Sequence, residues 1–154
     1  MSEIFYMIPA STKALWLIGV VLLFALPIPL VLLGYSMYAA DHTRFEVSQQ
    51  GLRISGDMLY GRFIPATALM LEQAKVLDLS REKSYQPKYK TNGMGLPGYK
   101  SGWFKLRNGE KALMFVTDPA RVVYIPTNKG YATMLSVAHP EIFLQSLRRI
   151  STAE

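Results

Sequence analysis

The longest uniform pattern in the chain is an apolar stretch near its N-terminus. Residues 14–40 contain no charged side chain, and 14–33 are almost entirely Leu, Ile, Val, Ala, Phe and Trp. A helix rises about 1.5 Å per residue, so about 20 residues cover the ~30 Å hydrocarbon core of a bilayer. The stretch has no polar stripe of the kind that a helix packed on a soluble core carries. The pattern predicts one transmembrane helix over 14–40, preceded by an N-terminal flank, 1–13.

A cleaved signal peptide is the alternative interpretation of this stretch. Signal peptides have a basic start and an apolar segment of about 7–15 residues. Here the flank carries only Lys13 against Glu3, and the apolar run is longer. The triplets Gly34-Tyr35-Ser36 and Tyr38-Ala39-Ala40 offer weak cleavage positions. We therefore expect a retained anchor.

Two prolines, Pro27 and Pro29, lie late in the apolar stretch. Each lacks a backbone N–H and crowds the carbonyl four residues earlier, so we expect a kink or short break near 26–28. Each half is too short to cross a bilayer alone. The alternatives are a bent single span and a notch whose free carbonyls face a partner helix.

Beyond the span, residues 41–154 show the alternation of polar and apolar side chains that is typical of strands. Gln50-Gly51 and Pro65 are the turn and strand-end signals of the first part. Residues 69–74 fit either a helical turn or a loop. The predicted strands of this first part are 44–48, 52–55, 60–65 and 75–79.

The second part of the domain contains the clearest hairpin signal. Asn108-Gly109 separates strands 103–107 and 111–116, and this pair suits a type I′ turn because both residues tolerate positive φ. We expect the last strand at 121–125. A helix then begins at His139-Pro140-Glu141, since proline fits the first helical turn and an acid suits the positive end of the helix dipole. Its apolar positions recur at helical spacing and predict packing on the sheet: Ile142, Phe143, Leu147 and Ile150.

The predicted fold is therefore α+β and mostly β. One transmembrane helix is followed by about seven antiparallel strands, forming a half-open barrel, and by one amphipathic C-terminal helix. Residues 41–154 are enough for one domain and too few for two.

Several motifs beyond the span resemble one family. They are the glycine-rich run at 91–99, Gly-Trp-Phe at 102–104, Lys-Ala-Leu at 111–113, the segment 122–127 and Pro-Glu at 140–141. Over residues 44–150 these motifs resemble the bacterial membrane-anchored pleckstrin-homology-like (PH-like) domain family. The resemblance implies a PH-like barrel, with ring-like self-assembly as a further implication. It implies little about activity, because a fold does not supply a function.

Charge and composition narrow the partners. The net charge of +6 lies wholly beyond residue 40, because Glu3 and Lys13 cancel before it. Such a surface favours anionic partners. There is no cysteine, so disulfides and thiolate chemistry are excluded. His42 and His139 lie too far apart for the spacing of a zinc site, so we expect no metal.

The segment 81–107 concentrates the positive charge of the domain. It combines seven basic residues and three tyrosines with one acid, Glu82, and we expect most of it, 81–102, to be a long loop. Glycines let backbone N–H groups approach an anion, and lysines add charge. The candidate lipid- or partner-binding residues are Arg81, Lys83, Tyr85, Lys88, Tyr89, Lys90, Tyr99, Lys100, Lys105 and Arg107. A solvated surface whose glycines only turn the chain is the competing interpretation.

Catalytic signatures are missing from the sequence. The run 93–98 is followed by no Gly-Lys-Ser/Thr and opens no helix, so it is neither a Walker loop nor a dinucleotide fingerprint. Asp57, Asp78 and Asp118 are isolated carboxylates near turns. We expect no catalytic residue, no cofactor and no nucleic-acid partner.

The sequence thus predicts a non-enzymatic interaction module in the bacterial inner membrane, anchored by a single span. We expect its basic Gly/Tyr-rich segment, 81–107, to contact either anionic lipid headgroups or a partner protein. That partner is either a different protein or a second copy of this chain in a homo-oligomer. The alternative is an accessory or structural subunit of a larger membrane complex. The positive-inside rule compares the Lys and Arg residues that flank the span, and their numbers are nearly equal on the two sides. The basic charge of the domain favours a cytoplasmic location for it.

Overall fold

The computed structural model describes residues 12–151, with side chains from 16 to 149. The flank 1–11 and the side chain of Ile150 lie outside the described residues. The chain divides into two compact units at Met37/Tyr38, and each is described by itself.

The apolar stretch forms two helices, α1 (Thr12–Ala25) and α2 (Pro27–His42), with Leu26 between them. The Leu26 N–H still donates to the Leu22 carbonyl at 3.1 Å. Pro27 has no N–H, so the next helical bond cannot form and the helix is interrupted there. The stretch Trp16–His42 is long and apolar enough to cross a membrane by length and composition. Most of its large apolar side chains are exposed, unlike those of a buried core helix.

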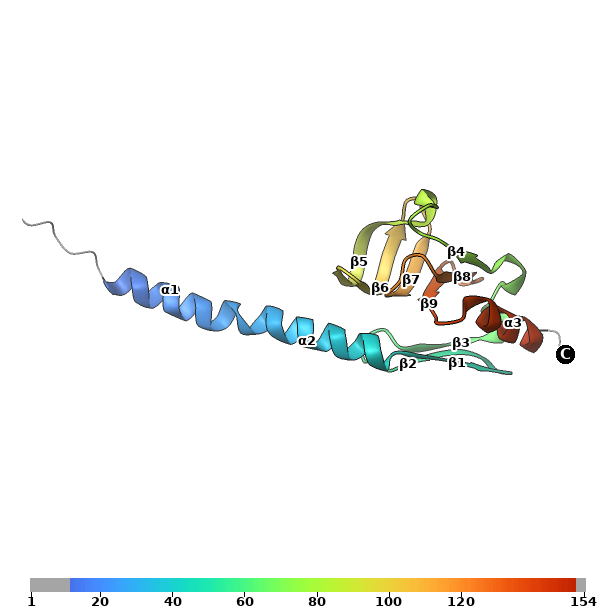
Figure 1. Cartoon of the computed structure of the whole chain (residues 1–154), viewed down its shortest axis with the longest axis horizontal. Helices are drawn as coiled ribbons and strands as arrows, with labels where there is room; N and C mark the ends of the chain where they lie inside the picture. Colours follow the sequence, from blue (N-terminus) through green and yellow to red (C-terminus); the bar gives the residue numbers. More distant parts are fainter. Residues whose placement is uncertain (1–11, 152–154) are drawn as a thin grey trace, which may run out of the picture. The chain divides into compact units, whose positions relative to one another are not determined.

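The second unit begins with the last turn of α2 and continues into two sheets (Figure 1). The first is antiparallel, in the order β1-β2-β3. Its strands are β1 (Arg44–Ser48), β2 (Gly51–Ser55) and β3 (Arg62–Pro65). Two short 3₁₀ turns follow, η1 (Ala66–Ala68) and η2 (Leu71–Gln73), where the sequence fitted either a helical turn or a loop.

The second sheet has the strand order β4-β8-β9-β7-β6-β5. Its first three strands along the chain are β4 (Lys75–Leu77), β5 (Pro87–Leu96) and β6 (Tyr99–Leu106), with η3 (Lys83–Tyr85) before β5. Its last three are β7 (Lys111–Val116), β8 (Val122–Pro126) and β9 (Ala132–Ser136). The amphipathic helix α3 (Pro140–Ser151) ends the described chain and begins at the predicted proline.

The six-stranded sheet has a core on each face, as alternate residues of β7 show. Leu113 and Phe115 pack with the three-stranded sheet and with Leu144 and Leu147 of α3. Met114 packs on the other face, in a cluster with β4, β6 and β8. The expected fold class is confirmed: an apolar N-terminal helix, mainly antiparallel sheets and a C-terminal helix.

Two details of the predicted fold after residue 102 were wrong. Strand β9 was not expected, and it pairs parallel with β7. It is short and buried over 132–135, so it shows no polar–apolar alternation. The hairpin at Asn108-Gly109 is not type I′, because only Gly109 has positive φ (89°). Gly109 N–H donates to the Leu106 carbonyl and Leu106 N–H to the Glu110 carbonyl, giving a three-residue loop.

Candidate binding groove

The predicted basic loop is mostly a β-hairpin. Strands β5 and β6 cover 87–96 and 99–106, so the expectation of one loop over 81–102 was wrong. Glycine is depleted in strands, and the polar, glycine-rich run concealed β5 from pattern analysis. The β5–β6 pairing also shifts register twice, between 87 and 89 and between 90 and 92, which removes strict alternation.

The hairpin forms a groove of about 450 Å³ on one face. Phe104 is a buried apolar wall of this groove, and Lys90 and Lys100 lie beside it. No carboxylate lines the groove within the part of the chain that the structure describes. We call it the β5–β6 groove. It is lined by Pro87, Tyr89, Lys90, Gly95, Leu96, Pro97, Lys100 and Phe104.

Glycines allow the close approach of the two strands. Gly93 lies opposite Gly102 in the register. Gly102 has φ of +108°, and a Cβ there would lie 2.6 Å from the Asn92 carbonyl oxygen. A Cβ at Gly95 would meet only Phe104, at an ordinary 3.7 Å. Backbone atoms of the paired strand therefore leave no room for a side chain at Gly93 or Gly102. Gly95, by contrast, leaves space within the groove.

Two of the predicted tyrosines are held in other interactions. Tyr99 is buried, and its hydroxyl donates to Asp57 Oδ2 at 3.4 Å. Tyr85 accepts a hydrogen bond from Lys75 Nζ at 2.9 Å and packs edge-on against Tyr124. The hydrogen bond to Tyr85 raises the pKa of Lys75 above its usual value. Of the three tyrosines, only Tyr89 lies in the β5–β6 groove.

The remaining predicted basic residues surround the hairpin without joining the groove. Arg81 forms an ion pair with Asp78, with 3.5 Å between Nε and Oδ2. Lys83 lies in η3, Lys88 is exposed near the start of β5, and Arg107 is exposed after β6. The structure thus brings together three of the predicted site residues in the groove: Tyr89, Lys90 and Lys100.

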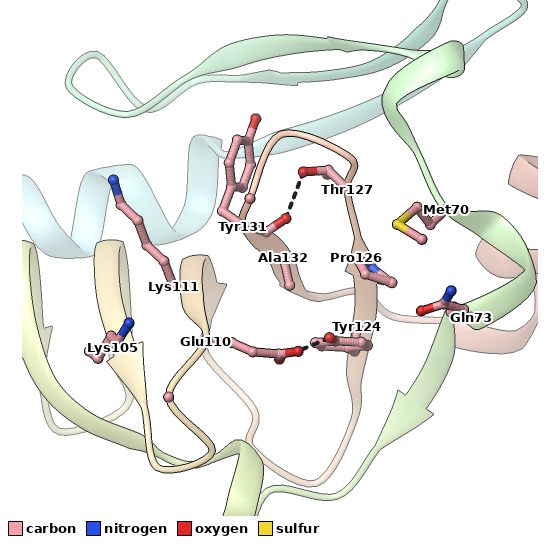
Figure 2. Close-up of a pocket in the computed structure, with 12 residues that line it drawn as sticks. Met70, Gln73, Lys105, Glu110, Lys111, Tyr124, Pro126, Thr127, Tyr131 and Ala132 are labelled. Atoms are coloured by element: carbon pink, nitrogen blue, oxygen red, sulfur yellow. Dashed lines mark hydrogen bonds between the residues drawn. The ribbon is translucent and has the colours of Figure 1, made fainter.

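Lys105 lines a different cavity, of about 390 Å³, with Lys111 and Glu110 (Figure 2). The Tyr124 hydroxyl donates to Glu110 Oε2 at 2.9 Å. Burial, and then this hydrogen bond, raises the pKa of Tyr124 well above its ordinary value. Sequence analysis missed this cavity, because its walls come from segments that are far apart along the chain, from Met70 to Ala132.

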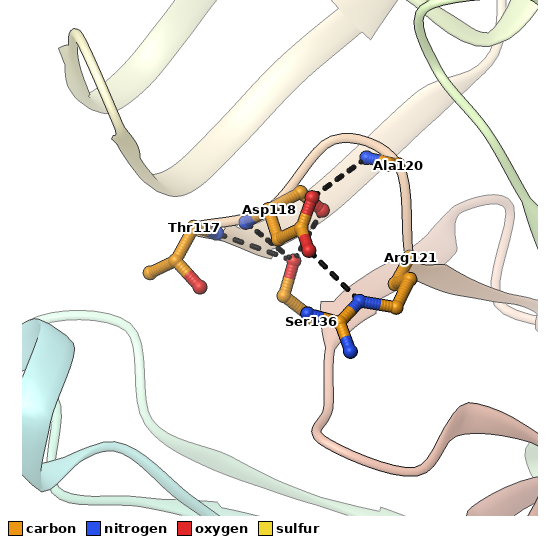
Figure 3. A network of polar contacts seen from close by, with 5 residues as sticks. All are labelled: Thr117, Asp118, Ala120, Arg121 and Ser136. Carbon is orange, nitrogen blue, oxygen red and sulfur yellow. Dashed lines mark hydrogen bonds and ion pairs between the residues drawn. The ribbon is translucent and has the colours of Figure 1, made fainter.

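The carboxylates named in the sequence hold turns. The Asp118 carboxylate accepts hydrogen bonds from the Ala120 N–H and from Arg121 Nε, both at 2.9 Å (Figure 3). The Ser136 hydroxyl accepts from the backbone N–H of Asp118 and donates to its carbonyl oxygen. The Ala120 N–H and the Arg121 side chain lower the pKa of Asp118. Asp78 likewise accepts from the Ser80 N–H and hydroxyl. Among residues 12–151, no group of three or more His, Cys, Asp or Glu could hold a metal ion.

Comparison with known families agrees with the resemblance seen in the motifs. A family model described as "Bacterial PH domain" matches residues 43–151, which covers both sheets and α3. No curated protein and no solved structure matches the chain.

Proposed function

Because the chain belongs to the bacterial PH domain family, whose members are generally non-catalytic, we propose that it is a membrane-anchored binding module. Trp16–His42 anchors it as a single span in the bacterial inner membrane, and the β5–β6 groove binds the headgroup of an anionic lipid. The observation that carries the proposal is the placement of Lys90 and Lys100 in one groove that no described carboxylate lines.

The location of the groove supports lipid as the ligand. Tyr99, which follows the β5–β6 turn, lines a small pocket together with Ala40 and Thr43, at the end of α2. These residues belong to the same compact unit. The β5–β6 turn, whose residues Leu96 and Pro97 line one end of the groove, therefore lies near the point where the chain enters the domain from the helix. Each basic residue near an anionic surface contributes about 1 kcal/mol, and a tether raises the effective concentration so that weak contacts suffice.

The test uses the full-length chain in nanodiscs that contain a phosphatidylglycerol analogue with a photoreactive headgroup. We expect cross-links to map to β5 and β6, to weaken with added salt, and to fall by about fivefold per lysine in Lys90→Gln/Lys100→Gln. Lys111→Gln/Lys129→Gln is the matched control, since it removes the same charge from exposed lysines outside the groove. Equal cross-linking of the two double variants would overturn the assignment of the groove to lipid.

A protein partner is the second candidate, because β5 is an edge strand. It ends the six-stranded sheet, so its outer N–H and C=O groups are open to an added strand. Pro87 and the two register shifts protect the first half of β5, which leaves 92–96 for pairing. A photoreactive residue at Met94 that joins to a second protein chain, with no lipid cross-linking at β5, would favour this candidate.

A further inference from the structure

The turn between β2 and β3 exposes two adjacent apolar side chains. Met58 is 85 % exposed, the highest value of any large apolar residue among those described, and Leu59 is 64 % exposed. Solvent contact of large apolar groups is unfavourable, and contiguous exposed apolar patches mark sites of interaction with proteins or membranes. We call Met58 and Leu59 the apolar turn.

Hydrogen bonds to a buried carboxylate hold the apolar turn in place. Asp57 is only 5 % exposed, and its Oδ1 accepts from the N–H groups of Leu59 (2.9 Å) and Tyr60 (3.1 Å). Its Oδ2 accepts from the hydroxyl of Ser101, in β6. The exposure is therefore a property of an ordered turn and not of a frayed loop. Because the turn is already ordered, burying its side chains in a partner costs little further conformational entropy.

Topology places the apolar turn beside the end of α2. Strand β1 starts directly after the helix, and β2 returns antiparallel to it, so that Arg44 pairs with Ser55. A Cβ at Gly56 would overlap the carbonyl oxygen of His42, which shows how closely the turn approaches the helix terminus. The last helical turn, from Tyr38, belongs to the same compact unit as the sheets.

We propose that the apolar turn inserts into the boundary between headgroups and acyl chains of the bilayer that the helix crosses. Lipid is the occupant because the last turn of the apolar span, from Tyr38 to His42, lies beside the apolar turn within the same compact unit, so a partner of the span's own chemistry is at hand there. Tyr38, which is 53 % exposed in the last turn of the helix, has the amphipathic character of residues at this depth. The inference rests on the membrane anchorage in the proposed function, but it does not require the charged groove, since apolar insertion needs no anionic lipid.

The experiment places one cysteine in the full-length chain, which has none of its own. Met58→Cys and, separately, Leu59→Cys carry an environment-sensitive fluorophore, in nanodiscs of phosphatidylcholine with or without lipids that bear a nitroxide near the headgroup. Gln49→Cys is the matched control, because it is an exposed turn position at the opposite end of β2. We expect blue-shifted emission and strong nitroxide quenching at 58 and 59, and neither at 49.

Each other outcome has a defined meaning. The proposal would be overturned if the fluorophore at 58 and at 59 showed no blue shift and no nitroxide quenching relative to the fluorophore at 49. A blue shift without quenching by the nitroxide lipids would also overturn it, because a protein surface would then cover the turn. Quenching by nitroxide lipids in nanodiscs that contain no anionic lipid, and its persistence in Lys90→Gln/Lys100→Gln, would support insertion even where the groove proves to bind no anionic lipid.

Discussion

At the scale of single residues, the glycines of the β5–β6 hairpin differ sharply in what they do. Gly102 combines positive φ with a backbone neighbour 2.6 Å from where a Cβ would lie, whereas Gly95 borders open space and Phe104. The glycine-rich sequence therefore contains both required and replaceable glycines, and only the strand pairing separates them.

This difference gives a direct prediction. Gly102→Ala should destabilise the domain by more than about 1 kcal/mol, since both the conformation and the space exclude a side chain. Gly95→Ala should change stability by no more than about 0.5 kcal/mol. Thermal unfolding of the full chain in detergent micelles, followed by the circular dichroism of its strands, measures both. Equal midpoints for the two variants would contradict the structural distinction.

At the scale of elements, the interruption between α1 and α2 follows from the two prolines. Pro27 and Pro29 cannot donate to the carbonyls of Leu23 and Ala25, so neither of these two carbonyls receives its usual helical N–H donor. In a bilayer such carbonyls are satisfied by neighbouring helices, ordered water or local adjustment of the backbone.

Pro27→Ala/Pro29→Ala should leave membrane insertion intact, because the apolar length of the span is unchanged. Extraction of the membranes at alkaline pH should leave the variant in the pellet, as it leaves the parent chain. Slower amide exchange over 26–30 should accompany the restored hydrogen bonds. If the variant also retains every co-purifying protein, the prolines do not form a notch for a partner helix.

At the scale of the whole molecule, function depends on which side of the membrane the domain occupies. The basic domain favours the cytoplasmic side, where anionic headgroups attract it. Gly95→Cys is a suitable reporter, because a Cβ there meets only an ordinary contact and the chain contains no other cysteine.

We expect Gly95→Cys to be protected from a membrane-impermeant maleimide in intact cells and labelled after lysis. The cysteine-free parent chain sets the background for both conditions. Labelling in intact cells would place the domain outside the cytoplasm, and an envelope partner would then replace inner-leaflet lipid as the expected ligand.

How far the sequence predicts the fold depends on how local each signal is. Strand β2 and helix α3 show strict alternation or helical spacing, and both were predicted. Strands β5 and β9 were missed for opposite reasons. β5 is polar and glycine-rich with shifted register, whereas β9 is buried over most of its length. Neither pattern carries a period that points to a strand.

The candidate site was less predictable than the fold. The sequence located the charge and aromatic content between 81 and 107. It did not distinguish Tyr99, which binds a buried carboxylate, from Tyr89, which is exposed in the groove. It also offered no reason to single out Met58, whose exposure depends on the contacts of its neighbour Asp57.

By itself, the sequence determined the apolar span, its interruption beside Pro27, the C-terminal helix and the predominance of strands. These follow from hydrophobic length, missing N–H groups and periodicity, all of which act within a few turns of chain. Only the tertiary structure decided that Lys90 and Lys100 share one groove and that an apolar turn lies beside the helix end. Those juxtapositions are set by strand pairing between distant segments, where a one-residue shift in register moves a side chain to the opposite face.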